Sequence, residues 1–214
     1  MVTIIENLGG FWHGWITTLS LALISMAAAF VLGTILTSLR ISPSLPLRTL
    51  ATVYVEVVRN LPLPVLFFVI VFELPQVGIV LPFFTFAVAT LAVYYAAFVS
   101  DALVSGTNAI LPGQFEASRA LGFSVPRMFA LVVLPQGARN AAPALITVFI
   151  LLTKGSAVAS AFGVSELIGN MEHLGNFFAP DILAILIATC LCYLSITIPA
   201  GLLLGRLEHR LRVS

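Results

Sequence analysis

Four ionisable residues lie within or at the edge of long apolar runs of this 214-residue chain: Glu56, Arg59, Asp101 and Lys154. A charge at the centre of a membrane helix costs about 2.5–3.5 kcal/mol, so such groups are expected to face protein or a water-filled cavity. There they can form ion pairs, relay protons or bind a charged solute. We find no nucleophile paired with a general base, so we expect no covalent chemistry.

Glu56 and Arg59 are three residues apart, so they share one face of a helix and could pair with each other. The sequence Leu-Pro-Leu-Pro follows at 61–64, and proline removes amide donors and kinks helices. Two interpretations stay open. The first is a kinked, charged helix beside a translocation path, with Asn60 as a further candidate for that path. The second is an internal ion pair that sets helix packing.

Lys154 lies about 13 residues into its apolar run, which is roughly 20 Å from the cytoplasmic end at the helical rise of 1.5 Å per residue. This depth is past the middle of a bilayer. Lys154 and the nearby Ser156 are therefore candidates to contact a solute. The alternative is a packing role, in which Lys154 pairs with Asp101 or Glu56.

Five apolar stretches are long enough to cross a bilayer, because about 20 helical residues span its hydrocarbon core. Hydrophobic residues make up 60% of the chain and charged residues 9%, far below the quarter that is typical of soluble domains. We therefore expect one all-α integral membrane domain over residues 1–214. The expected spans are 15–39, 51–72, 81–103, 141–162 and 182–204.

The basic residues outside the spans are confined to alternate loops. The N-terminal tail and the loops 73–80 and 163–181 contain no Lys or Arg. By the positive-inside rule, the N-terminus is expected outside and the C-terminus in the cytoplasm. The outer loops carry Glu73, Glu166, Glu172 and Asp181, which predicts a mildly acidic outer face. The cytoplasmic set is Arg40, Arg48, Arg119, Arg127, Arg139, Arg206, Arg210 and Arg212.

The longest cytoplasmic loop, 106–139, holds a polar segment between two apolar runs. Good helix formers occupy 114–121, Gly122 is a plausible helix stop, and Pro126 suits the first turn of another helix. We expect two short helices with a sharp turn at Gly122-Phe123, the second ending near Pro135. A solvated hairpin that only joins two spans is the alternative.

The residues of this loop also follow a specific spacing. Glu-Ala-Ser at 116–118 is followed by Gly122, Val132 and then Leu-Pro at 134–135. This pattern resembles the EAA loop of ATP-binding-cassette (ABC) importer permeases, with Ser118 in place of the second alanine. The resemblance implies a coupling helix that docks into a groove on a cytoplasmic ATPase. The implied docking residues are Glu116, Ala117, Ser118, Arg119, Ala120, Leu121 and Gly122.

Two further stretches, 54–68 and 151–167, resemble the polar amino-acid (HisMQ-type) class of these permeases, and 33–50 resembles its glutamate-type members. The resemblance implies the type I importer fold with about five spans. It also places a substrate-contacting residue, often acidic or Asn, just after Lys154, where this chain has Gly155. Two interpretations follow: either a sister subunit builds most of the substrate site, or an acidic substrate is preferred by Lys154.

The resemblance implies a permease subunit of an ATP-driven importer for polar amino acids, of the glutamate or glutamine type, in the bacterial plasma membrane. Its implied partners are ABC ATPase subunits, an identical or homologous sister permease, and an extracytoplasmic substrate-binding protein. The sequence contains no Gly-x-x-x-x-Gly-Lys-(Ser/Thr) phosphate loop. We therefore expect no bound cofactor and no enzymatic activity, with ATP and Mg²⁺ held by the ATPase.

Two other functions compete with this one. A self-contained ion-coupled transporter could use Glu56, Asp101 and Lys154 as a relay, but such proteins usually show paired internal repeats, and this chain shows none. A non-transporting scaffold would leave the buried charges and the loop unexplained.

Metal, disulfide and nucleic-acid binding are not expected. Cys190 and Cys192 are two residues apart and point to different faces of a helix, which disfavours a disulfide or a metal pair. The three histidines, His13, His173 and His209, show no zinc spacing. A net charge of +1 and the lack of a basic run favour no nucleic-acid partner.

Overall fold

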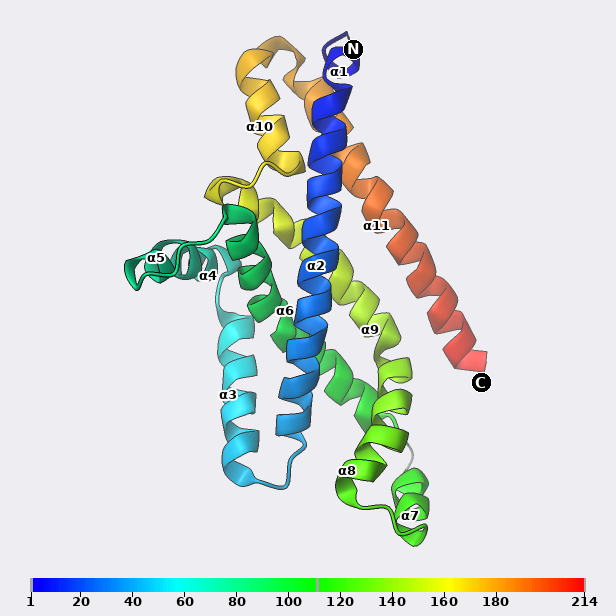
Figure 1. Ribbon diagram of the computed structural model, residues 1–214. Coiled ribbons are helices and arrows are strands. Elements are labelled where there is room, and N and C mark those ends of the chain that lie inside the picture. Colours follow the sequence, from blue (N-terminus) through cyan, green and yellow to red (C-terminus); the bar gives the residue numbers. More distant parts are fainter. Residues whose placement is uncertain (1, 111, 214) are drawn as a thin grey trace.

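Helices make up the regular structure of the chain (Figure 1). The computed structural model describes residues 2–110 and 112–213, and no strand occurs within them. The α-helices are α1 Val2–Glu6, α2 Leu8–Arg40, α3 Leu45–Asn60, α4 Leu63–Phe68, α5 Leu74–Gln76, α6 Phe83–Asn108, α7 Pro112–Ala120, α8 Val125–Met128, α9 Leu134–Gly155, α10 Leu167–Phe177 and α11 Ile182–Val213. Two π-helical segments, Val69–Glu73 and Phe129–Val133, and two 3₁₀ segments, Ser156–Phe162 and Ala179–Asp181, connect some of them.

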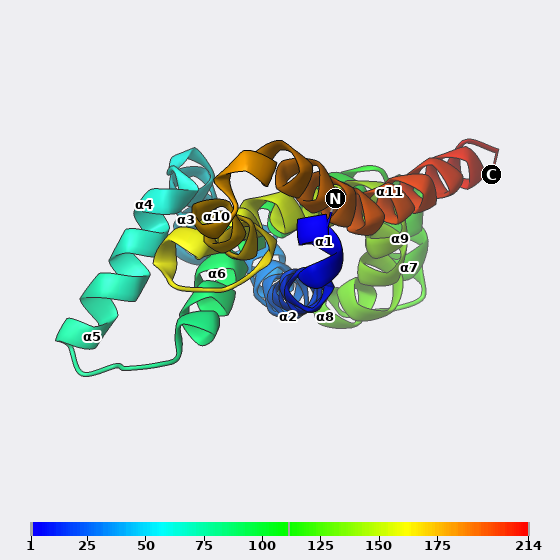
Figure 2. The same cartoon turned by 90° about the horizontal axis from the view of Figure 1, so that it is seen from above.

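Within the described residues, four helical segments are long and apolar enough to cross a membrane, and they cover four of the five expected spans. The expected span at 51–72 is not one straight helix: Leu45–Asn60 and Leu63–Gln76 meet at an angle of 108°. Leu61 is extended, with ψ of 138°, because a residue before proline avoids the helical region. Pro64 then occupies the first turn of α4, where proline is tolerated. Figures 1 and 2 show α4 and α5 projecting sideways from the other helices.

Helix α2 is the central helix and packs against α3, α6, α9, α10 and α11. Its buried face is built mainly from small residues at spacings of three and four, which let neighbouring membrane helices approach closely. At Gly33, for example, a Cβ atom would lie only 2.6 Å from Val99 of α6. The small residues of this face are Gly14, Thr18, Ala22, Ser25, Ala29, Gly33 and Thr37.

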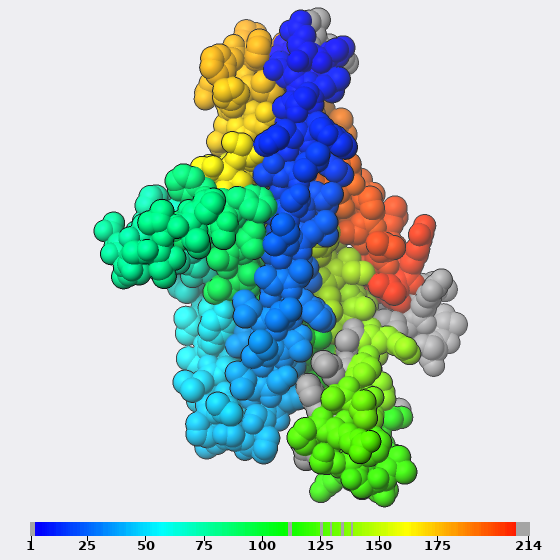
Figure 3. All heavy atoms as spheres, in the orientation of Figure 1, coloured from blue at the N-terminus to red at the C-terminus, as the bar shows by residue number. Residues whose placement is uncertain are grey.

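The apolar core lies where α2, α4, α6 and α9 meet. Phe67 of α4 stacks on Phe162, with ring centroids 5.0 Å apart, so the helix that follows the sharp bend is anchored in the core. Leu91 of α6 and Leu152 of α9 are fully buried in the same cluster. The space-filling view in Figure 3 shows that residues near 115–135 form a separate lobe at one end of the molecule, beyond this core.

Candidate functional site

The lobe is a helical elbow formed by α7, the turn at Gly122 and α8. The turn has the hydrogen bonds of a Schellman motif: Phe123 N donates to Ser118 O at 3.1 Å, and Gly122 N donates to Arg119 O at 3.0 Å. Gly122 adopts φ of +75°, a left-handed conformation that glycine enters without steric cost. The predicted stop at Gly122 and the sharp turn are therefore both present.

Most of the implied docking residues of α7 are exposed. Glu116, Ala117, Arg119 and Ala120 face solvent, and Leu121 is 74% exposed at the tip of the elbow. Ser118 differs: it is buried, and its hydroxyl donates to Gln114 O at 2.7 Å. The elbow thus offers a surface with small, charged and apolar residues, while Ser118 belongs to the inner side of α7.

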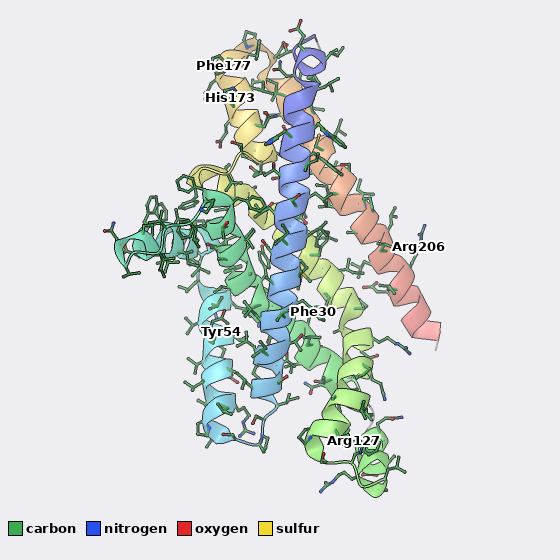
Figure 4. All side chains as sticks on the ribbon, viewed as in Figure 1. Phe30, Tyr54, Arg127, His173, Phe177 and Arg206 are labelled. Carbon is green, nitrogen blue, oxygen red and sulfur yellow. The ribbon has the colours of Figure 1, made fainter. Side chains whose placement is uncertain are left out.

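The prediction that the second short helix ends near Pro135 is wrong. The chain continues as helix from Val125 through the π-helical segment Phe129–Val133 into α9. Pro135 lies in the first turn of α9, and the wider π-helical turn before it changes the ladder of backbone hydrogen bonds that its ring would otherwise disrupt. Arg127 stacks over the Phe123 ring at 5.5 Å, and Figure 4 shows Arg127 at the end of the molecule. The elbow is therefore joined directly to α9.

A cavity of about 380 Å³ separates the elbow from the turn between α2 and α3. Phe115, Met128 and Val133 line it from the elbow side, and Ile41 and Pro43 line it from the turn. Its walls are mostly apolar. A partly open cavity therefore lies between the elbow and the α2–α3 turn. The chain connects the elbow to α6 at one end and to α9 at the other.

Asp101 of α6 binds two arginines from two other helices. Arg40 Nη1 donates to one carboxylate oxygen at 2.6 Å, and Arg59 Nη1 donates to the other oxygen. Arg59 also lies over the Phe98 ring at 5.5 Å. These are the two ion pairs of the described residues, so the packing alternatives are wrong: Arg59 does not pair with Glu56, and Lys154 pairs with neither Asp101 nor Glu56.

The remaining candidates for the substrate path lie on α3 and at the end of α9. Glu56 and Asn60 are exposed on α3, and the Asn60 amide donates to Glu56 O at 2.7 Å. The Lys154 side chain is exposed on the surface of the chain. Ser156 is buried and donates to Thr153 O at 2.8 Å. Of these candidates, Lys154 is the charged residue on α9, and its exposed ammonium group is accessible to a solute or a neighbouring subunit.

The absence of a side chain at position 155 has a steric reason. A Cβ atom at this position would lie 2.3 Å from Tyr95 Oη, far inside the contact distance. The Tyr95 hydroxyl donates to Leu151 O at 2.9 Å and is held there by α6. The Tyr95 hydroxyl therefore occupies the space that a side chain at position 155 would need. The spacing of the sequence did not indicate this contact.

Glu166 is one of the four acidic residues expected on the outer face, but its side chain is fully buried, whereas Glu73 and Glu172 are exposed. It caps α10, accepting from Ile168 N at 2.8 Å and Gly169 N at 2.9 Å, and it also accepts from the Tyr193 hydroxyl at 2.6 Å and Thr18 at 3.3 Å. Burial raises the pKa of Glu166 above its usual value, and these hydrogen bonds oppose that rise. In the sequence, the only sign that Glu166 caps a helix was its position just before the apolar residues that begin α10.

Metal ligands do not cluster in the described part of the chain: no three His, Cys, Asp or Glu side chains there could hold an ion together. Both cysteines are free thiols. The side chains described above provide two ion pairs, an exposed helical elbow and an exposed ammonium group.

Known proteins resemble the chain over almost its whole length. The chain is 33% identical over 211 residues to the probable glutamine ABC transporter permease protein GlnP of Bacillus subtilis, covering 96% of this chain and 95% of GlnP. It is 34% identical over 218 residues to the glutamate transport system permease protein GluC of Corynebacterium glutamicum, covering 96% and 94%.

Solved structures show the same fold. The chain superposes on a crystal structure of an amino acid ABC transporter with histidines with a TM-score of 0.87 and 29% identity, covering 98% of this chain and 97% of the other. The fold is also that of the inward-facing MetNI methionine ABC transporter, with a TM-score of 0.75 and 23% identity, covering 94% and 98%. The family model of the binding-protein-dependent transport system inner membrane component matches residues 29–213. The chain is therefore a member of this family of ABC importer permeases.

Proposed function

We propose that the chain is the permease subunit of an ATP-driven importer for polar amino acids in the bacterial plasma membrane. The observation that carries the proposal is the exposed elbow, in which residues 116–122 have the spacing of an EAA loop and all but Ser118 face solvent around the Schellman turn. The relatives named as glutamine and glutamate permeases support a substrate of that type.

The elbow would dock into an ATPase subunit, and its attachments suit the transfer of motion. α6 ends at Asn108 just before α7, and α8 runs into α9 through helical residues. A displacement of α7 would therefore act on two membrane helices at once. Two permease subunits, identical or homologous, would enclose the path, two ATPases would hold ATP and Mg²⁺, and an extracytoplasmic binding protein would deliver the amino acid.

An ion-coupled relay through Glu56, Asp101 and Lys154 fits the geometry less well. Both oxygens of Asp101 are engaged by guanidinium groups, so each step of a relay would have to break an ion pair. The family match also favours the ATP-driven importer.

Purification tests the proposed function. The chain, tagged at one end and extracted in mild detergent from its native host, is expected to bring down an ATPase that carries a phosphate loop, in an amount comparable to its own. The same complex in liposomes, with the binding protein present, should accumulate labelled L-glutamine, L-glutamate or L-arginine when ATP is supplied. Uptake driven by an ion gradient in the absence of any ATPase would instead establish the relay.

Thiol labelling tests the orientation that the arginine distribution predicts. Glu6 and Glu208 are exposed near opposite ends of the chain. In a background with both native cysteines changed to alanine, Glu6→Cys is expected to react with an impermeant maleimide in intact cells, and Glu208→Cys only after the membrane is opened. Labelling in the reverse order would contradict the topology and place the elbow outside the cell.

A further inference from the structure

We propose that Asp101 is a positioning residue that transmits movement of the elbow to the break between α3 and α4. The proposal rests on the proposed function, because it assigns a mechanical link within that transport cycle. Asp101 is the only carboxylate among the described residues that binds two cationic side chains, and each of its oxygens holds a different helix.

The carboxylate joins the ends of two helices to a third. Arg40 is the last residue of α2, and Arg59 is the penultimate residue of α3, two positions before the extended residue Leu61. Asp101 itself lies in the last two turns of α6, roughly 10 Å from its end at Asn108. The elbow is thus one short helical segment away from Asp101, and the break is about one turn away from Arg59.

The other contacts between α3 and α6 are weaker constraints on register. Val55, Val58 and Ala97 form an apolar cluster there, and apolar surfaces can slide past one another with little change in contact. The Tyr54 hydroxyl of α3 also donates to Val93 O of α6 at 2.8 Å, but a neutral hydrogen bond is roughly half as strong as a charge-assisted one. A guanidinium–carboxylate bond is directional, and it fixes the relative position of the two helices. When α6 moves with the elbow, Asp101 would therefore carry the end of α3, and with it the sideways segment of α4 and α5.

The charges allow this link to be cut in a controlled way. The cluster contains two cations and one anion, so Asp101→Asn leaves two guanidinium groups facing each other in a partly buried place. Arg59→Gln is the cleaner variant, because it releases α3 while the Arg40–Asp101 pair stays balanced. Asp101→Glu keeps the carboxylate and serves as the rescue variant.

The measurement compares transport with ATP hydrolysis in the purified complex in liposomes, with the binding protein and labelled L-glutamine, L-glutamate and L-arginine as probes. For Arg59→Gln we expect the number of amino acids moved per ATP to fall about tenfold, within the range of 5–150-fold typical of couplings between sites. ATP hydrolysis and assembly should stay near wild type. Asp101→Asn should behave similarly, and Asp101→Glu should recover most of the lost transport.

Arg48→Gln is the matched control, since Arg48 is an exposed arginine on the same helix and lies outside the two ion pairs. Arg48→Gln should keep the wild-type number of amino acids moved per ATP. An unchanged ratio in Arg59→Gln would overturn the proposal, as would a raised KM with unchanged maximal transport per ATP, which would make Arg59 a substrate contact. Full recovery of the ratio in the double variant Asp101→Asn/Arg59→Gln would overturn it too, because relief of repulsion would then be sufficient. A wild-type complex without ATP-driven uptake would refute the proposed function instead.

Discussion

Gly122→Val is expected to abolish ATP-driven uptake while the protein still inserts in the membrane. Gly122 has φ of +75°, where a β-branched residue is strongly disfavoured, so valine would open the Schellman turn. Left-handed geometry costs a residue with a side chain about 1–2 kcal/mol, and the two backbone hydrogen bonds to Ser118 and Arg119 would be lost with it. A displaced α7 would no longer present Leu121 and its neighbours to the ATPase.

Gly122→Asn is the matched control, because asparagine tolerates the left-handed region much better than valine. No neighbouring atom lies within 4 Å of a Cβ at this position, so steric overlap would not explain a difference between the two variants. The readouts are ATPase recovered with the tagged permease and uptake in liposomes. Wild-type uptake by the valine variant would refute the docking role of the elbow, and equal loss in both variants would assign the effect to size rather than to φ.

Lys154→Met is expected to lower uptake of an anionic amino acid about tenfold or more. A hydrogen bond to a charged group contributes about 1.5–3 kcal/mol, and the attraction between ammonium and carboxylate is stronger in a partly dry cavity than in water. Methionine keeps much of the length of lysine and removes its charge. Because Lys154 is exposed on the chain, its loss should leave the packing of α9 and recovery of the ATPase unchanged.

Uptake of L-glutamate, L-glutamine and L-arginine should be measured on one preparation of Lys154→Met. The loss of uptake should be largest for glutamate, smaller for glutamine and smallest for arginine, because the Lys154 ammonium group attracts an anion and repels a second cation. Lys154→Arg, which preserves the positive charge, should lose less than Lys154→Met. Normal assembly with wild-type uptake of all three would exclude Lys154 from the translocation path.

The long spans and the elbow were predictable because each depends on local sequence. An apolar run of about 20 residues is sufficient for a membrane helix, and a glycine after good helix formers is a common helix stop. The break at Leu61 was foreseen as a kink, but its size, 108°, was not, since two prolines near one another set the start of a new helix whose direction depends on packing. The stacking of Phe67 on Phe162 is one such contact.

The partners of individual side chains could not be predicted, for a physical reason. Glu56 and Arg59 share a helix face, yet Arg59 turns to Asp101, which lies 42 positions away in the chain. The same applies to Gly155, which is explained by the hydroxyl of Tyr95 on another helix. Partners of this kind depend on how helices pack, and spacing within one segment contains no information on it.

Glu166 has a consequence for the order in which the chain is made. Two of its hydrogen-bond donors, Ile168 N and Gly169 N, belong to its own helix, whereas Thr18 and Tyr193 lie 148 residues before it and 27 residues after it. During synthesis the N-terminal helices emerge first, so α10 can form its cap early but must wait for α11 before the carboxylate has all its donors. A nascent chain released before Tyr193 would keep an incompletely bonded buried acid, and quality-control proteases would meet this end of the bundle as the last part to close.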